Sequence, residues 1–152
     1  MSRVASRYFG SLEYTSGETF TFPEGLPGFP SETSFLPIEI PEQFPIVYLQ
    51  SLKTPELCFV SVPVNCLVAG YQLAVSAEDL ALVGFGPDAA PGPGMLCLAL
   101  LCFEGDGTAV ANLRAPLVVN VANRRAAQMI QTEAEYPVRF ALNAPQETGV
   151  CC

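Results

Sequence analysis

The chain has 152 residues and a formal net charge of −8; half of its residues are apolar and 14% are charged. This composition excludes an intrinsically disordered chain, because disordered segments pair low hydrophobicity with high charge. The acidic charge argues against direct binding to nucleic acid, whose phosphates would be repelled, and favours either a basic protein partner or an acidic surface kept for solubility.

The first residues and the most apolar run predict neither export nor membrane insertion. In residues 1–11 no apolar stretch follows Arg3 and Arg7, as a secretory signal would require. The longest apolar run, residues 95–103, is far below the roughly 20 residues of a membrane-spanning helix. We therefore expect a cytoplasmic protein that has no membrane partner.

Short apolar, β-branched or aromatic runs separated by turn residues dominate the chain. Period-two alternation in TFTF and FLPIEI favours strands, as do 14 prolines, which would break long helices. We predict an all-β, mainly antiparallel, small barrel-like fold in one domain, with its core over about 8–143 and a flexible tail at 144–152. The predicted strands cover residues 18–22, 34–40, 45–52, 57–64, 95–103, 115–121, 127–132 and 137–142.

Three segments interrupt the strand pattern. Ser76 is a candidate N-cap, followed by two acidic residues and later by Gly84, which predicts one short helix over 77–83. A further helical turn is predicted at 123–127. The stretch PDAAPGPG, residues 87–94, is too rich in Pro and Gly for regular structure and is predicted to be a loop.

Residues 22–30 read FPEGLPGFP, a turn rich in Pro and Gly but set among apolar side chains. In one interpretation the Phe side chains fasten the first strands to the core and the glycines supply positive φ. In the other, Leu26 and Pro27 are partly exposed and form an apolar anchor for a partner, ringed by Glu24 and Glu32. The candidate contact residues of this turn are Glu24, Leu26, Pro27 and Phe29.

Four further residues have a structural and a functional interpretation. Glu39 and Glu42 flank a proline at an expected strand end, where they are either solvated acids or charges that repel RNA. Asn112 is either a turn residue that caps backbone groups or a partner contact. Arg114 either pairs with a carboxylate of the core or reaches a partner.

The residues of acid–base and metal chemistry are scarce. The chain has no histidine, so any catalysis would have to rest on carboxylates, thiols or a cofactor. Its six cysteines match neither a disulfide framework nor zinc-ligand pairs, so we expect reduced thiols and assign no catalytic, metal-binding or cofactor-binding residue from the composition. The alternative is a small barrel that binds a flavin between subunits. Only Arg114, Arg124 and Arg125 could then hold the flavin phosphate.

Several ordered motifs resemble one known family, the flagellar assembly factor FliW. Residues 25–29, GLPGF, resemble its G-L-x-G-F signature, and residues 49–51, LQS, and 112–116, NLRAP, resemble its later motifs. The remaining matches are Phe59, Val62, Pro63, Tyr71, the acidic segment 76–80, Asn120, Gln128 and residues 136–139. The resemblance covers about 22–140, whereas the 87–94 loop and the C-terminal residues depart from the pattern.

The resemblance implies a non-catalytic, all-β barrel protein with two competing protein partners. Members of this family bind newly made flagellin in the cytoplasm. When flagellin is absent, they bind the carbon storage regulator CsrA, a basic RNA-binding translational repressor, and so relieve repression of the flagellin message. We expect the same two partners for this chain.

Overall fold

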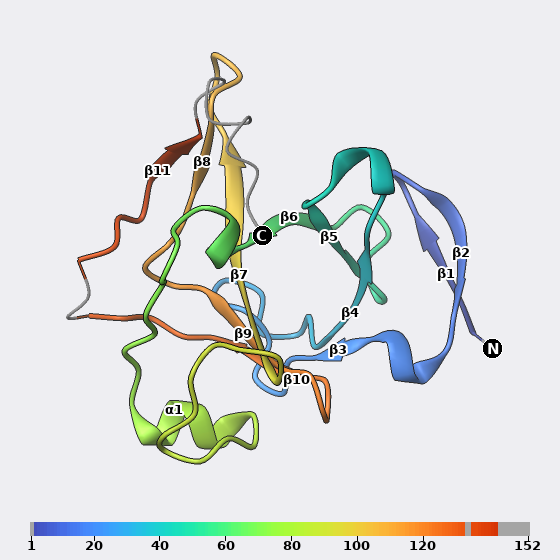
Figure 1. Cartoon of the computed structure of the whole chain (residues 1–152). Coiled ribbons are helices and arrows are strands. Elements are labelled where there is room, and N and C mark those ends of the chain that lie inside the picture. Colours follow the sequence, from blue (N-terminus) through green and yellow to red (C-terminus); the bar gives the residue numbers. More distant parts are fainter. Residues whose placement is uncertain (1, 133–134, 143–152) are drawn as a thin grey trace.

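The computed structural model describes residues 2–132 and 135–142 and shows a closed β barrel. Seven strands follow one another around it in the order β7-β6-β5-β4-β3-β10-β9, and β9 pairs back onto β7 to close the ring (Figure 1). Neighbouring strands are antiparallel except β3 and β10, which are parallel. The barrel strands are β3 (Phe20–Thr21), β4 (Ser34–Ile38), β5 (Val47–Ser51), β6 (Cys58–Pro63), β7 (Met95–Phe103), β9 (Leu117–Asn120) and β10 (Arg125–Gln128).

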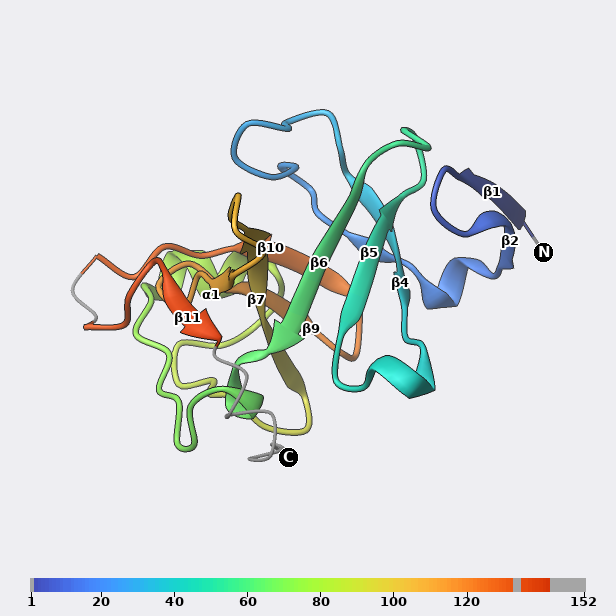
Figure 2. The same cartoon turned by 90° about the horizontal axis from the view of Figure 1, so that it is seen from above.

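Four more strands lie outside this ring. The second half of β7 continues beyond it and pairs with β8 (Ala109–Ala111), which pairs with β11 (Phe140–Leu142). The hairpin of β1 (Ser2–Ser6) and β2 (Gly10–Tyr14) forms a separate two-stranded sheet. Seen in both views, this hairpin and helix α1 (Ala77–Leu82) lie on opposite sides of the barrel (Figure 1, Figure 2).

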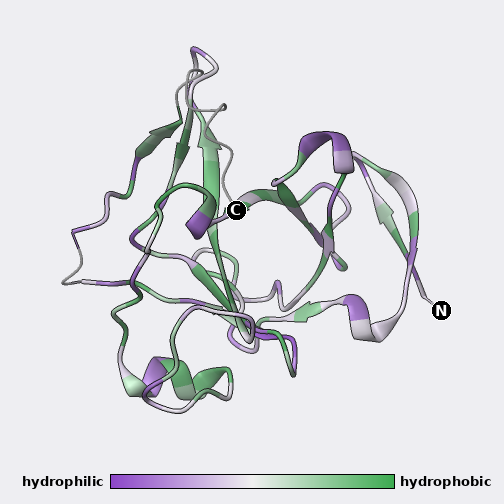
Figure 3. Ribbon diagram, in the orientation of Figure 1, coloured by the Kyte–Doolittle hydropathy of each residue, from purple (hydrophilic) through white to green (hydrophobic). Residues whose placement is uncertain are grey.

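Period-two alternation along β9 divides the apolar core into two clusters. Leu117 and Val119 face the barrel interior, where they pack with the aromatic side chains of Phe22 and Phe35. Val118, between them, faces a second cluster that includes Leu80 and Val83 of the α1 region and Tyr71. All four residues of β9 are buried because both faces of the strand are covered, and hydrophobic colouring runs along β7 as well (Figure 3).

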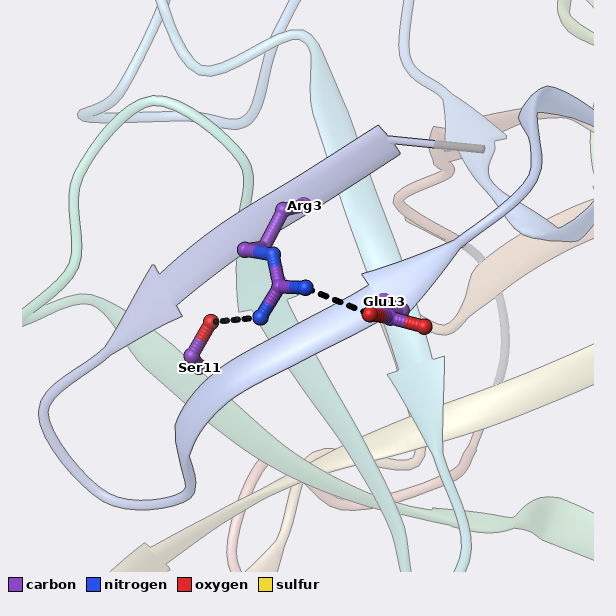
Figure 4. Close-up of polar contacts among 3 residues, drawn as sticks. All are labelled: Arg3, Ser11 and Glu13. Carbon is purple, nitrogen blue, oxygen red and sulfur yellow. Dashed lines mark hydrogen bonds and ion pairs between the residues drawn. The ribbon is translucent and has the colours of Figure 1, made fainter.

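An exposed ion pair joins the two strands of the β1–β2 hairpin, and a buried hydrogen bond attaches the hairpin to the barrel. Arg3 donates to Ser11 Oγ at 3.1 Å and lies 2.5 Å from a Glu13 carboxylate oxygen across the hairpin (Figure 4). Because both charged side chains are exposed, this pair contributes no more than about 1 kcal/mol. On the other face, Ser6 Oγ donates to the fully buried Gln50 amide oxygen at 2.7 Å.

The structure confirms the predicted fold class and the short helix. Ser76 Oγ accepts a hydrogen bond from the Asp79 backbone N–H at 3.0 Å, and residues 87–94 form a loop apart from one isolated bridge at Gly92. The helical turn predicted at 123–127 is wrong, because β10 begins at Arg125. Strands β1, β2 and β8 were not predicted, and the flexible tail predicted at 144–152 lies outside the described residues.

Two further findings concern the cysteines and the membrane. Cys58, Cys97 and Cys102 are free thiols, but Cys66 is disulfide-bonded, so the expectation of reduced thiols is wrong for Cys66. Within the described residues, no helix has both the length and the apolar character needed to cross a bilayer.

Candidate functional site

The GLPGF segment forms a tight turn at the start of the barrel. Leu26 and Phe29 exchange two backbone hydrogen bonds, at 3.1 and 2.7 Å, around Pro27 and Gly28. Pro at the second position and a glycine with φ of +85° at the third are features of a type II turn. Gly25 has φ of +70°, and a Cβ there would lie 2.5 Å from the carbonyl oxygen of Pro30. The motif is therefore explained by backbone geometry.

Burial separates the predicted contact residues of this turn into two groups. Glu24 and Pro27 are exposed, and Phe29 is 40% exposed, with its ring edge-to-face against Phe59 at a centroid distance of 5.5 Å. Leu26, however, is only 4% exposed and packs in the barrel core. The interpretation of Leu26 as an exposed anchor is wrong, because the turn directs its side chain inward.

A surface pocket of about 380 Å³ joins this turn to helix α1 and strand β10. We call it the turn–helix pocket. Its three walls are the turn, helix α1 and strand β10. They are far apart in sequence, and the packing of α1 against the barrel brings them together. Its lining residues are Glu24, Gly25, Leu26, Pro27, Gly28, Pro30, Asp79, Leu82, Ala127 and Gln128.

Helix α1, one wall of the pocket, is fixed to the barrel by two side-chain amides, one at the end of β9 and one in the turn that follows it. Asn120 and Asn123 both donate to the carbonyl oxygen of Val83, at 2.8 and 3.2 Å. The buried side chains of Leu80 and Val83 pack in the second apolar cluster. These contacts leave Leu82 pointing outward, 41% exposed, on the pocket side.

Glu39 and Glu42 lie at the other end of the barrel. Both are exposed, and Glu42 belongs to a short 3-10 helix, Pro41–Gln43, that follows β4. Strand β4 runs from the turn to this helix, so its five residues separate the two sites by roughly 16 Å. The structure therefore does not join these acids to the turn–helix pocket.

Asn112 and Arg114 make backbone contacts away from the pocket lining. Asn112 Oδ1 accepts hydrogen bonds from the N–H groups of Arg114 and Ala115, both at 3.1 Å, which confirms its structural interpretation as a turn residue. Arg114 Nε donates to the carbonyl oxygen of Tyr136 at 2.9 Å. Its guanidinium thus holds the segment before β11, in place of the carboxylate pairing considered from the sequence.

Other motif residues also form buried polar networks. The Tyr71 hydroxyl donates to the Leu113 carbonyl and accepts from Gln131 Nε2 at 2.7 Å, and burial raises the pKa of Tyr71 to about 12. The Tyr71 ring stacks on Tyr136 with centroids 4.3 Å apart. These residues hold the 71–75 segment against the barrel, so the role of these motif residues is to stabilise the fold.

Glu32 is a buried acid held by hydroxyl groups, and it is not part of a rim around the turn. The residue is 7% exposed, and its carboxylate accepts hydrogen bonds from Ser51 Oγ at 2.5 Å and Thr54 Oγ1 at 2.6 Å. Burial raises the pKa of Glu32, but these two hydroxyls and the nearby Lys53 charge outweigh it, and the pKa falls below its ordinary value of 4.5. The ionised form therefore links the turn to the segment after β5.

Glu32→Gln is expected to lower the free energy of unfolding by about 2 kcal/mol at pH 7, because hydrogen bonds to a charged acceptor are lost. A depressed folded pKa stabilises the fold above the unfolded value, and this contribution disappears as pH falls through the folded pKa. The difference from wild type should thus shrink below pH 4.5. Urea unfolding across this range measures it.

The control for this prediction is Glu24→Gln, which changes an exposed acid of the same turn. Its effect should stay within about 0.5 kcal/mol. A Glu32→Gln deficit that is the same at pH 3.5 and pH 7 would contradict a role for the ionised carboxylate.

The described residues offer neither a metal centre nor support for a flavin. No group of three or more His, Cys, Asp or Glu side chains in this part of the chain could hold a metal ion. Two of the three arginines considered for a flavin phosphate are engaged elsewhere. Arg114 binds the Tyr136 carbonyl, whereas Arg124 donates to the carbonyls of Glu18 and Thr19 and stacks 4.7 Å over the Phe20 ring.

Sequence reasoning missed all four residues that line the turn–helix pocket from outside the turn: Asp79, Leu82, Ala127 and Gln128. Asp79 was assigned only to the first turn of the helix. The sequence did hold a signal for Leu82: it lies two places after Leu80, so on a helix its side chain faces away from the side that Leu80 buries. Nothing in the sequence placed that face beside Pro27.

The comparisons with known proteins agree over nearly the whole chain. The FliW protein family model matches residues 3–142. The flagellar assembly factor FliW of Syntrophomonas wolfei is 31% identical over 153 residues, 97% of this chain and 96% of the relative. That of Carboxydothermus hydrogenoformans is 31% identical and covers 92% of this chain and 88% of the relative. A crystal structure of the flagellar assembly factor FliW matches with a TM-score of 0.80 at 27% identity, covering 95% of this chain and 99% of the other.

Proposed function

The chain belongs to the FliW family of flagellar assembly factors, and on that premise we propose that it binds newly made flagellin in the cytoplasm. When flagellin is scarce, the free protein binds the translational regulator CsrA and relieves its repression. The observation that carries this proposal is the family match across residues 3–142, with relatives covered over nearly their full length.

This role requires binding without catalysis. Each partner draws the protein from a common pool by mass action, with a free energy of about RT ln(1 + [L]/Kd). Rising flagellin therefore releases the regulator with no further component. A sequence without histidine, the commonest general base, fits a binding protein.

The charge of the chain suits a basic RNA-binding partner. With a net charge of −8, the domain attracts a basic protein and repels RNA. Repulsion acts only within about 8–10 Å at cellular salt, so acidic side chains must lie near the RNA path. We assign this role to the exposed Glu39 and Glu42. We assign a second partner contact, at the opposite end of β4, to Glu24, Pro27 and the exposed edge of Phe29.

The double variant Glu39→Lys/Glu42→Lys is expected to bind purified CsrA at least about tenfold more weakly, since four units of charge change at one surface. It should also displace a fluorescent RNA from CsrA less well than wild type. Fluorescence anisotropy with and without the RNA measures both effects. The matched control is Asp88→Lys/Glu135→Lys, which makes the same charge change at exposed positions elsewhere.

The assignment of Glu39 and Glu42 is contradicted if both double variants weaken CsrA binding equally, because net charge alone would then explain the effect. It is also contradicted if neither variant changes displacement of the RNA.

A further inference from the structure

We propose that the turn–helix pocket receives the side chain of a lysine or arginine from a partner protein. The proposal rests on the proposed function only for the identity of that partner. The pocket combines a volume suited to one long side chain with an apolar wall and two acidic groups at its rim.

The apolar wall matches the alkyl stem of a basic side chain. Leu82 is 41% exposed, Pro27 and Pro30 are exposed on the turn, and Ala127 of β10 also lines the pocket. Lysine and arginine bury their methylene stems along apolar surfaces while the charged end stays polar. The pocket volume of about 380 Å³ lies near the lower end of the range for ligand sites, as expected for a single side chain.

The rim supplies the opposite charge. Glu24 on the turn and Asp79 on α1 both line the pocket, one exposed and one half-buried. Within residues 2–132 and 135–142, neither carboxylate has a hydrogen bond or an ion pair. Asp79 uses only its backbone N–H, which donates to Ser76.

Most of the cations of this chain are engaged away from the pocket. The chain has only seven lysines and arginines. Four of these have partners elsewhere: Arg3 with Glu13, Arg114 with the Tyr136 carbonyl, Arg124 with the Glu18 and Thr19 carbonyls, and Arg139 with Glu104. None of the seven lines the pocket, so an external cation is the group that completes the two free carboxylates.

The walls of the pocket are held in place before any partner binds. The turn is closed by backbone hydrogen bonds between Leu26 and Phe29, and Gln128 Nε2 donates to the Ala115 carbonyl at 3.0 Å. Helix α1 is fixed through the carbonyl of Val83. A preformed site loses little conformational entropy when it binds. An isolated basic side chain should therefore show weak, saturable binding.

The test is a titration of the ¹⁵N-labelled protein, followed by NMR, with two probes that share a long alkyl stem. N-acetyl-arginine amide carries the charge, and N-acetyl-norleucine amide lacks it. We expect the arginine probe to shift the amide signals of Gly28, Asp79 and Leu82 in a saturable way. Glu24→Gln/Asp79→Asn should weaken this binding about tenfold, whereas Asp88→Asn/Glu135→Gln should leave it unchanged.

Equal binding of the norleucine probe, or unchanged arginine binding in Glu24→Gln/Asp79→Asn, would overturn the proposal. Partner binding separates this failure from failure of the proposed function. If wild type and Glu24→Gln/Asp79→Asn bind flagellin and CsrA equally well, the pocket proposal fails alone. If the arginine probe binds the pocket but the wild-type protein binds neither partner, the proposed function fails.

Discussion

Leu26→Asp is expected to unfold much of the barrel, with a loss of about 4 kcal/mol or more in the free energy of unfolding. Leu26 is 4% exposed and packs with Phe22 and Phe35, so the substitution would bury a carboxylate without a partner. Domains of this size are stable by only about 5–15 kcal/mol. Urea denaturation followed by far-ultraviolet circular dichroism measures the loss.

The control for this prediction is Pro27→Asp, which places the same carboxylate one residue further along at the exposed tip of the turn. It should cost no more than about 1 kcal/mol, mainly through the lost restriction on φ. If Leu26→Asp were as stable as Pro27→Asp, Leu26 would be an exposed contact residue and the packing of the turn described above would be incorrect.

Gln50→Leu is expected to lower the free energy of unfolding by about 3 kcal/mol, although leucine is apolar and of similar size. The fully buried Gln50 amide accepts from Ser6 Oγ at 2.7 Å, and its nitrogen lies within 3.1–3.3 Å of the carbonyl oxygens of Ser51, Thr54, Pro55 and Leu57. The variant would leave the Ser6 hydroxyl without its acceptor and would remove the amide donor from all four carbonyls, of which those of Thr54, Pro55 and Leu57 keep one backbone hydrogen bond each. Thermal unfolding measures the overall loss.

Hydrogen exchange locates the same effect. Loss of the Ser6 contact should speed exchange in β1 and β2 more than in β7, because Gln50 connects that hairpin to the barrel. The control is Gln72→Leu, at an exposed glutamine whose side chain makes no hydrogen bond within the described residues. A Gln50→Leu variant as stable as this control would contradict the buried network.

The barrel strands could be predicted because each carries its own local pattern. MLCLALLCF was assigned with the bounds of β7, and β4, β5 and β6 each lie within the predicted runs. The missed hairpin has no such pattern: SRVAS, the sequence of β1, contains a single large apolar residue. Its position depends on the Ser6–Gln50 contact across 44 residues, which no local window contains.

The candidate site was predictable in its backbone but not in its side-chain directions. Two glycines with positive φ explain why the GLPGF motif must be a rigid turn, yet the inward direction of Leu26 depends on packing against distant strands. Asp79, the second acidic residue of the pocket, comes from a helix more than 50 residues after Glu24. Motif residues such as Gln50, Tyr71 and Asn112 proved to hold the fold together.

The most direct test of the proposed partner exchange is a pull-down from the source cytoplasm with the tagged full-length protein, repeated with added purified flagellin. The proposal predicts that CsrA co-purifies at low flagellin and is progressively replaced by flagellin as the latter rises. Recovery of an unchanged amount of CsrA at every flagellin concentration, or of neither protein, would contradict the exchange.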